Sequence, residues 1–126
     1  MKKRALIIED NEKNRMLEKD LLEVAGFEVL EAADGKSGID LAKRKKPDVI
    51  ILDLKLPDMQ GTRVAVNLRQ ATETRAIPII FVTAVVSEEV VKEFQGISGA
   101  LFLTKPINTR TFAGEIIRYI SGGSHG

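Results

Sequence analysis

The sequence of 126 residues contains no cysteine and only one histidine. The absence of cysteine excludes disulfide bonds, thiol catalysis and cysteine-based zinc sites. The histidine, His125, lies in the glycine- and serine-rich segment at residues 121–126, so we assign it no catalytic role. Nucleophilic or metal chemistry in this chain must therefore use carboxylates, hydroxyls and amines.

Long apolar runs and a strong charge of one sign are also missing. No stretch approaches the roughly 20 apolar residues of a membrane span, and the basic start at residues 1–4 is not followed by the longer apolar region of a signal peptide. The net charge is +1, which gives no argument for a nucleic-acid partner. We expect a cytoplasmic protein that binds neither membrane nor nucleic acid directly. The basic run at residues 43–46 is expected to end a helix, where cations complement the helix dipole, rather than to form a docking patch.

Four short apolar runs each end on a reactive polar residue. Residues 5–8 lead into Glu9 and Asp10, residues 49–52 into Asp53, residues 79–82 into Thr83, and residues 101–103 through Thr104 into Lys105 and Pro106. Runs of this kind, rich in isoleucine, valine and leucine, are typical of parallel strands covered by helices on both faces. Ligands bind at the carboxyl ends of such strands. We therefore expect these polar residues to converge on one site.

Helical patterns alternate with the strands. Asn11 is a candidate N-cap for a helix over about residues 12–25, with Leu17, Leu21 and Val24 on one face and Gly26 as its stop. The remaining predicted elements follow in chain order: a strand over 27–32, a turn at Asp34-Gly35, a helix over 37–46 ended by Pro47, a helix over 61–70, a helix capped by Ser87, and a helix capped by Asn108 or Thr109 that runs to about Ile120.

This alternation predicts the fold class. Five βα units with right-handed crossovers form an α/β fold, a doubly wound parallel five-stranded sheet in a three-layer sandwich. With the flavodoxin-like strand order 2-1-3-4-5, the topological switch point lies between the first and third strands. Those strands end on Glu9-Asp10 and on Asp53. The topology and the acidic residues thus predict the same site.

Clustered carboxylates repel one another unless a positive charge compensates them. Oxygen ligands of this kind suit Mg²⁺, and a shielded carboxylate can act as a nucleophile toward phosphorus. Asp53 is the best nucleophile candidate, while Lys105 and Thr83 offer a cation and a hydroxyl for phosphoryl oxygens. Each residue alone has an ordinary alternative, namely a helix cap, a strand terminus or a surface lysine. Only the combination is specific.

The combination resembles the receiver domains of bacterial two-component response regulators, in the CheY-like superfamily. The motifs are Glu9-Asp10, Asp53, Thr83-Ala84 and Lys105-Pro106, together with the loop from Asp53 to Gly61, in which Pro57 and Gly61 are in register. The stretch from Glu9 to Asn14 is similar to the DivK type of single-domain regulator. The resemblance covers about residues 4–120. We expect a receiver domain over residues 1–120 and a flexible tail over residues 121–126.

The resemblance implies a phosphoacceptor that is switched by a partner and is not an enzyme with turnover. Asp53 would accept a phosphoryl group from a phosphohistidine on a histidine kinase or a histidine phosphotransferase. Asp10, Asp53 and the backbone carbonyl of Lys55 would bind Mg²⁺ directly, and Glu9 would act mainly through water. Thr83 and Lys105 would hold the phosphoryl oxygens.

The resemblance also implies a switch. The Lys105-Pro106 bond is expected to be cis, and Phe102 stands at the place of the switch aromatic that turns inward when Thr83 moves toward the phosphate. This movement would change the face of helix 4, strand 5 and helix 5, which would contact a downstream target protein or form a phosphorylation-dependent homodimer.

Several positions depart from the family pattern. Glu9 replaces the commoner Asp, and Gln60 stands where an Asp often precedes the loop glycine. Lys55 and Val85 occupy positions that tune dephosphorylation in this family, which leaves the phosphoryl lifetime open. The segment over residues 94–100 shifts the usual Gly-Ala spacing, so the details of the output face are open too.

Three alternatives remain open at this point. A magnesium-dependent phosphatase of the haloacid dehalogenase type would need an Asp where Lys55 stands. A flavodoxin-like flavin or nucleotide binder would need a glycine-, serine- or threonine-rich loop after the first strand in place of residues 9–12. Finally, the chain could be a stand-alone regulator, which the DivK-like start favours, or a receiver excised from a hybrid histidine kinase or a larger regulator.

Overall fold

Five strands form one parallel sheet in the order β2-β1-β3-β4-β5 in a computed structural model that describes residues 2–84, 87–89, 92 and 100–122. The strands are β1 (Arg4–Ile8), β2 (Glu28–Ala32), β3 (Val49–Leu52), β4 (Ile79–Thr83) and β5 (Ala100–Thr104). The helices are α1 (Glu12–Val24), α2 (Gly35–Lys45), α3 (Gly61–Gln70) and α5 (Phe112–Ser121). The predicted fold class and strand order are confirmed.

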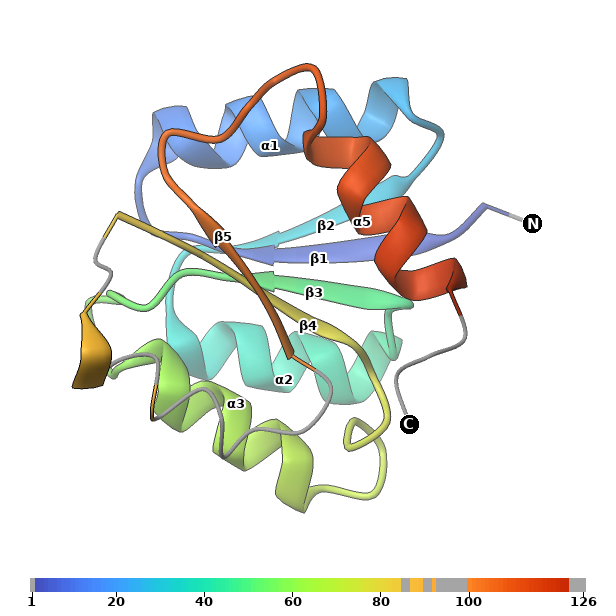
Figure 1. The fold of residues 1–126 in the computed structure, drawn as a ribbon. Coiled ribbons are helices and arrows are strands. Elements are labelled where there is room, and N and C mark those ends of the chain that lie inside the picture. The colour runs from blue at the N-terminus through green and yellow to red at the C-terminus, as the bar shows by residue number, and fades with distance from the viewer. Residues whose placement is uncertain (1, 85–86, 90–91, 93–99, 123–126) are drawn as a thin grey trace.

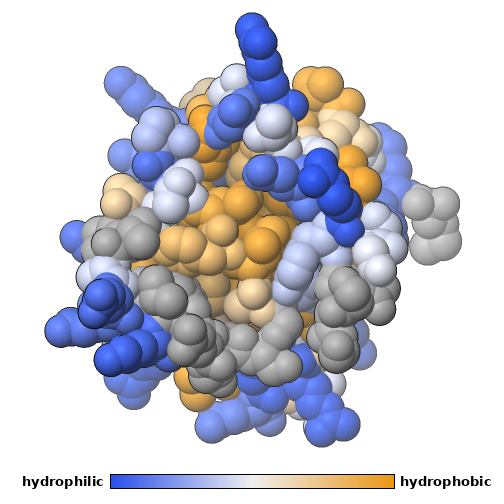
Figure 2. All heavy atoms as spheres, viewed as in Figure 1, coloured by the Kyte–Doolittle hydropathy of each residue, from blue (hydrophilic) through white to orange (hydrophobic). Residues whose placement is uncertain are grey.

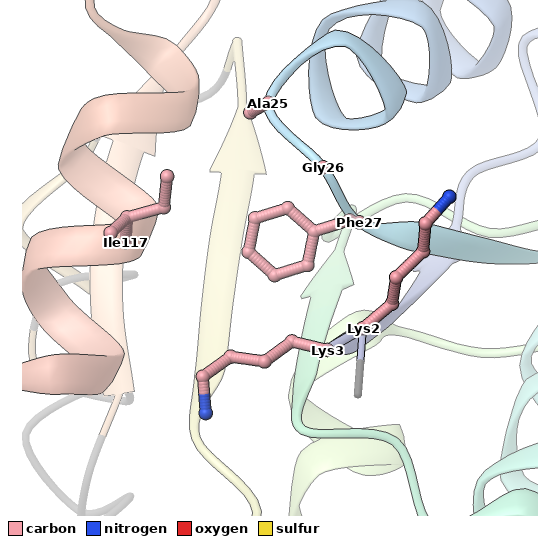
Figure 3. A pocket seen from close by; sticks show the side chains of 6 residues that line it. All are labelled: Lys2, Lys3, Ala25, Gly26, Phe27 and Ile117. Atoms are coloured by element: carbon pink, nitrogen blue, oxygen red, sulfur yellow. The ribbon is translucent and has the colours of Figure 1, made fainter.

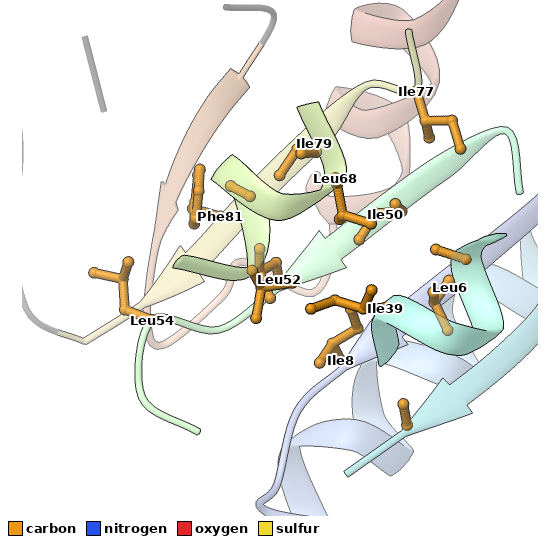
Figure 4. Close-up of a cluster of buried hydrophobic side chains, with 14 residues drawn as sticks. Leu6, Ile8, Ile39, Ile50, Leu52, Leu54, Leu68, Ile77, Ile79 and Phe81 are labelled. Carbon is orange, nitrogen blue, oxygen red and sulfur yellow. The ribbon is translucent and has the colours of Figure 1, made fainter. Parts of the chain in front are cut away.

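Helices cover both faces of the sheet (Figure 1). α1 and α5 lie on one face, and α2 and α3 lie on the other. The three central strands β1, β3 and β4 are almost wholly buried, as expected for parallel strands covered on both sides. Each face has its own apolar core, and Figure 4 shows the one between the sheet and α2 and α3.

Both ends of α1 follow the predicted signals. The Asn11 side chain accepts a hydrogen bond from the Asn14 N–H at 3.0 Å. At the other end Gly26 has φ of +101°, the left-handed conformation that glycine adopts at low cost. The N–H groups of Gly26 and Phe27 donate to the carbonyls of Glu23 and Leu22, each at 3.0 Å, which is a Schellman motif.

The predicted apolar face of α1 is only partly right: Leu21 packs against the core, but the other two predicted residues do not lie on the buried face. Leu17 and Val24 are 41% and 89% exposed, whereas Glu18 and Leu22 are buried. The direction in which a helix faces is set by its packing on the sheet. Here the stripe containing Glu18 and Leu22, four residues apart, packs inward and Leu17 lies at its border. α1 therefore places a carboxyl where a leucine was expected.

Two further helix starts differ from the predictions. Asp34 is the N-cap of α2 and not part of a turn, because its side chain accepts from the Ser37 N–H at 2.7 Å. α5 begins at Phe112, later than predicted, because the carbonyl and side chain of Asn108 hold a separate turn that precedes the helix. α2 ends with the basic run as predicted, and the left-handed Lys46 precedes Pro47.

Some predictions lie wholly or partly outside the described residues. Glu88, Glu89 and Lys92 have helical backbone after Ser87, but most of that predicted helix, Val85 and residues 94–99 are not described. The same holds for residues 123–126, whereas Ser121, assigned to the tail, ends α5. Among the helices that are described, none has the length and apolarity needed to cross a membrane.

Gly61, the first residue of α3, lies unusually close to the end of β3. A Cβ atom at this position would lie 2.2 Å from the carbonyl oxygen of Asp53 and 2.8 Å from the Cα of Leu54. These are backbone atoms, which cannot move aside as a flexible side chain could. The N–H of Gly61 donates to the carbonyl of Leu54 at 2.7 Å. Glycine here lets α3 start directly against the segment that follows Asp53.

We therefore expect Gly61→Ala to lower the free energy of unfolding by about 3 kcal/mol, as overpacking against backbone does. Gly114→Ala is the matched control, since Gly114 lies within α5 and its Cβ would meet no atom within 4 Å. That control should raise stability by about 0.5–1 kcal/mol through helix propensity. Urea unfolding monitored by circular dichroism measures both, and a Gly61→Ala protein as stable as wild type would contradict the argument.

Candidate functional site

The sheet brings the predicted polar residues together at the carboxyl ends of its strands. Ile8 is in register with Leu52, Leu52 with Phe81, and Thr83 with Thr104. The residues that follow or end these strands therefore share one edge. They are Glu9 after β1, Asp53 after β3, Thr83 at the end of β4 and Lys105 after β5. The convergence predicted from the sequence is confirmed.

Lys105 joins two of these carboxylates. Its Nζ donates to Asp53 Oδ2 at 3.0 Å and to Glu9 Oε1 at 2.5 Å. The side chains are 17%, 11% and 2% exposed for Lys105, Asp53 and Glu9, so the pairing is largely shielded from water. Charge-assisted hydrogen bonds of this kind are stronger than neutral ones. Residues 52 and 96 positions apart in the chain are thereby held in contact.

Three carboxylates form an acidic cluster beside this pairing. Glu9, Asp10 and Asp53 each offer one oxygen, and these oxygens all lie within 4.8 Å of one another. Glu9 and Asp53 are buried and Asp10 is exposed. A set of carboxylate oxygens that is open to solvent on one side suits Mg²⁺, which retains several water molecules when it binds protein. The donor set therefore fits a hard divalent cation.

The backbone fixes where these side chains lie. The N–H of Asp53 donates to the Ile8 carbonyl at 3.1 Å, and the N–H of Lys105 donates to the Thr83 carbonyl at 2.9 Å. The N–H of Lys55 lies 3.4 Å from Asp53 Oδ1, a long hydrogen bond. Because the anchors are sheet-like backbone bonds, the two reactive groups Asp53 and Lys105 are presented from rigid positions.

Burial dominates the electrostatics of the site. It raises the pKa of Glu9 from 4.5 to about 7, where the hydrogen bond from Lys105 acts in the opposite direction and the nearby Asp53 adds to the rise. Burial also opposes the charge of Lys105, but its hydrogen bonds to Glu9 and Asp53 outweigh burial and raise the pKa of Lys105. The lysine is thus held as an ammonium while Glu9 can change its protonation near neutral pH.

The residues predicted to act in the switch are placed as follows. Thr83 is 1% exposed. Phe102 is half-buried in β5 and packs against the core on the α2 and α3 side. The Lys105–Pro106 peptide bond is cis, as expected. Lys55, whose carbonyl was predicted to bind Mg²⁺, is exposed and forms an isolated antiparallel β-bridge with Gln60.

Reasoning from the sequence missed three polar residues around the site. Arg15 donates to the Glu9 carbonyl at 2.8 Å. Asp58 accepts from the N–H groups of Gly35 and Lys36 at 2.8 and 2.9 Å, which ties the start of α2 to the loop after Asp53. Glu18 is 3% exposed on α1. The only sequence signal for Glu18 is its spacing of four from both Asn14 and Leu22 on one helix face.

Two of the cavities on the α1 and α5 side of the sheet differ in what lines them. One, of about 340 Å³, adjoins the acidic cluster and is lined by Asn14, Leu17, Glu18, Ala84, Lys105, Pro106 and Ile107. The other, of about 600 Å³, lies at the opposite end of the strands. There Lys2 and Lys3 extend in different directions around Phe27 and Ile117 (Figure 3), so no polar groups converge. Only the smaller cavity belongs to the site.

Comparison with known proteins agrees with this geometry. The response regulator receiver domain family matches residues 5–116. The polar-differentiation response regulator DivK of Brucella anthropi is 34% identical over 120 residues, which are 95% of this chain and 98% of that protein. The match extends over nearly the whole length of both proteins.

Solved structures agree as well. The chemotaxis response regulator CheY4 of Vibrio cholerae has a TM-score of 0.87 at 28% identity, covering 94% of this chain and 99% of that one. The receiver domain of the sensor histidine kinase PA1611 from Pseudomonas aeruginosa has a TM-score of 0.86 at 26% identity, covering 95% and 98%. That structure holds a magnesium ion coordinated in its active site cleft.

Receiver domains are phosphoacceptors that interact with histidine kinases and with downstream targets. The fold, the acidic cluster beside a half-buried lysine, and the family match over residues 5–116 agree. This chain belongs to the response regulator receiver domain family and is a CheY-like, DivK-like receiver of two-component signalling.

Proposed function

We propose that Asp53 is the phosphoacceptor of this receiver and that its donor is a phosphohistidine on a histidine kinase or a histidine phosphotransferase. The observation that carries the proposal is the hydrogen bond from Lys105 to Asp53, made at the carboxyl end of the central strand with Glu9 as the second acceptor. A carboxylate held beside an ammonium and two further acids is arranged for phosphoryl transfer.

The step itself is a displacement at phosphorus. An oxygen of Asp53 forms the new P–O bond, the P–N bond to the donor imidazole breaks, and that nitrogen keeps the electron pair and takes up a proton. Lys105 and the Thr83 hydroxyl would neutralise charge on the phosphoryl oxygens. Lys105 is already bound to Asp53, so its ammonium lies next to the position that the phosphoryl group would occupy.

Asp10, Asp53 and the Lys55 carbonyl are the proposed direct ligands of Mg²⁺, with Glu9 acting mainly through water. The close spacing of the Glu9, Asp10 and Asp53 oxygens supports this set. When bound, Mg²⁺ would neutralise the carboxylates and the charge that develops on the phosphoryl group. The chain's own task is to keep these acids together, which the buried ends of β1 and β3 do.

The output would be a change in protein contacts and not catalytic turnover. Figure 2 shows an apolar area in the middle of the face that carries β5 and α5. Leu101, Leu103 and Tyr119, with Glu115 and Arg118, line a cavity of about 250 Å³ there. We propose that a downstream target protein, or a second copy in a phosphorylation-dependent homodimer, binds to this face. Thr83 and Phe102 would transmit the change from the phosphorylation site to it. We also propose that the protein acts in the cytoplasm.

The first prediction concerns the acceptor. Incubation with acetyl phosphate and Mg²⁺ should add one phosphoryl group to the wild type, because Asp53 is activated by the cluster. Without Mg²⁺, and in Asp53→Asn, intact-mass spectrometry should show no adduct. Asp40→Asn is the control, since this acid is exposed on α2 and lies outside the acidic cluster, and it should leave the adduct unchanged. A phosphoryl group on Asp53→Asn would refute the assignment.

The second prediction concerns Lys105 in the absence of metal. Lys105→Met leaves Glu9 and Asp53 without their shared cation, which should lower the free energy of unfolding by roughly 3 kcal/mol at pH 8. At pH 5 the loss should be smaller, because Glu9, with its pKa raised to about 7, is then protonated in the folded state.

Urea unfolding at the two pH values measures this difference. The control Lys36→Met, which removes an exposed lysine, should change the free energy of unfolding little at either pH. Added Mg²⁺ should restore stability to Lys105→Met more than to the wild type, because it supplies the missing positive charge. A loss that is equal at pH 5 and pH 8 would show that Lys105 contributes by packing instead.

A further inference from the structure

Glu18 is a buried carboxyl on a helix that packs against the sheet. It is 3% exposed in the middle of α1, and within the part of the chain that the structure describes its side chain has no hydrogen bond or ion pair. Of the three cations on the same helix, Arg15 and Lys19 pair with Glu31 at 3.4 and 3.3 Å, and Lys13 is exposed. A buried carboxyl with no partner destabilises the folded state. Packing alone does not explain a glutamate here.

The surroundings of Glu18 connect it to Lys105. Both line the cavity of about 340 Å³ between α1 and the segment after β5. Three charged groups influence Glu18 across this space: Glu9 from the end of β1, Asp53 from the end of β3 and Lys105 from the end of β5. The other lining residues, such as Leu17 and Ile107, are mainly apolar. Lys105 is the cation among these groups.

Lys105 is thus near two sets of acids. Its ammonium binds Glu9 and Asp53, and it lines the same cavity as Glu18. The cavity is several times larger than the roughly 30 Å³ that one water molecule occupies in the liquid. The cavity therefore leaves unfilled space beside both Lys105 and Glu18.

We propose that Glu18 is a positioning residue for Lys105, and that its carboxylate gives the Lys105 ammonium a second partner on the cavity side when a divalent cation occupies the acidic cluster. This inference rests on the proposed function, because it concerns the same site. It gives a reason for an acid at a core position. A divalent cation among Glu9, Asp10 and Asp53 repels the ammonium that now binds two of them, and Glu18 compensates that repulsion.

The direction of the effect follows from charge. Burial, together with the negative charge of Glu9, raises the pKa of Glu18 from 4.5 to about 8. In the metal-free protein Glu18 is therefore protonated at pH 6 and ionised at pH 9. Only the ionised form can attract Lys105, so the contribution of Glu18 to cation binding should be absent at pH 6 and complete at pH 9.

The test is the dissociation constant of Mg²⁺, measured by NMR titration of the wild type and Glu18→Gln at pH 6 and pH 9. At pH 9, Glu18→Gln should weaken binding by roughly three- to tenfold, the size expected for charges near the surface of a protein. At pH 6 the two proteins should bind alike, because Glu18 is then uncharged in the wild type. Glu23→Gln, which removes an exposed acid from the same helix, should bind like wild type at both pH values.

A second pair of variants separates positioning from direct attraction. In a Lys105→Met background, Glu18→Gln should no longer alter Mg²⁺ affinity, because Glu18 acts through the lysine. If Glu18→Gln still weakens Mg²⁺ binding in that background, Glu18 attracts Mg²⁺ directly by its own charge and the positioning role is overturned. An equal affinity of wild type and Glu18→Gln at pH 9 would overturn the inference as well.

The stability of the metal-free protein is an independent check that the buried Glu18 carboxyl lacks a stabilising partner. The pKa of Glu18 is 4.5 in the unfolded chain and about 8 in the folded protein. Between pH 4.5 and pH 8 the folded protein therefore binds the Glu18 proton more tightly than the unfolded chain does. Metal-free stability should therefore fall as pH rises through this range, and Glu18→Gln should unfold at a higher temperature than wild type at pH 8. A lower unfolding temperature would mean that the carboxyl has a stabilising partner, which contradicts the premise.

The two proposals fail in different ways. If the wild type gains no phosphoryl group at Asp53 and binds no Mg²⁺, the proposed function is wrong. If the wild type does both and Glu18→Gln matches it at pH 9, only the role of Glu18 is wrong.

Discussion

The hydrogen bonds from Lys105 to Glu9 and Asp53 are the interaction on which the site depends. Two acids at the ends of adjacent parallel strands would repel each other strongly if both were ionised in a buried position. The ammonium of a residue that follows β5 removes this conflict, and it does so across 96 and 52 positions of the chain. Because the three strand ends are fixed by backbone bonds, the charges meet in one arrangement.

Asp53 is held more rigidly in the site than the side chain of Lys105. Asp53 is held by the sheet, by the close approach of Gly61 to its carbonyl and by the loop that Asp58 ties to α2. Lys105 is attached to the sheet by its backbone, but its long side chain borders an open cavity. The proposed phosphoacceptor Asp53 is therefore fixed, while the side chain of Lys105, the proposed cation for the phosphoryl oxygens, has space beside it.

Buried acids also relate function to stability. Burial raises the pKa of Glu9 and of Glu18 to about 7 and about 8, so each disfavours folding when it ionises. A chain optimised for stability alone would carry an apolar side chain at position 18. The negative charge becomes favourable only when additional positive charge enters the acidic cluster, which is the condition under which a receiver is phosphorylated.

The sequence alone determined the fold class and the convergence of Glu9, Asp53, Thr83 and Lys105, because period, run length and the residue after each strand are local signals. The strand order was taken from the flavodoxin-like fold that this alternation resembles. It also predicted where α1 starts and stops, since Asn11 and Gly26 act through nearby backbone groups. Tertiary structure alone decided which face of α1 is buried and where α2 and α5 begin.

The sheet sets the rotation of α1 about its own axis. Glu18 is therefore more buried than Leu17, although leucine is the more hydrophobic residue. The contact of Asp58 with the start of α2 spans more than twenty residues, and the cavity behind Lys105 exists only between packed elements. Such features depend on distances between distant segments, which no local pattern of residues encodes.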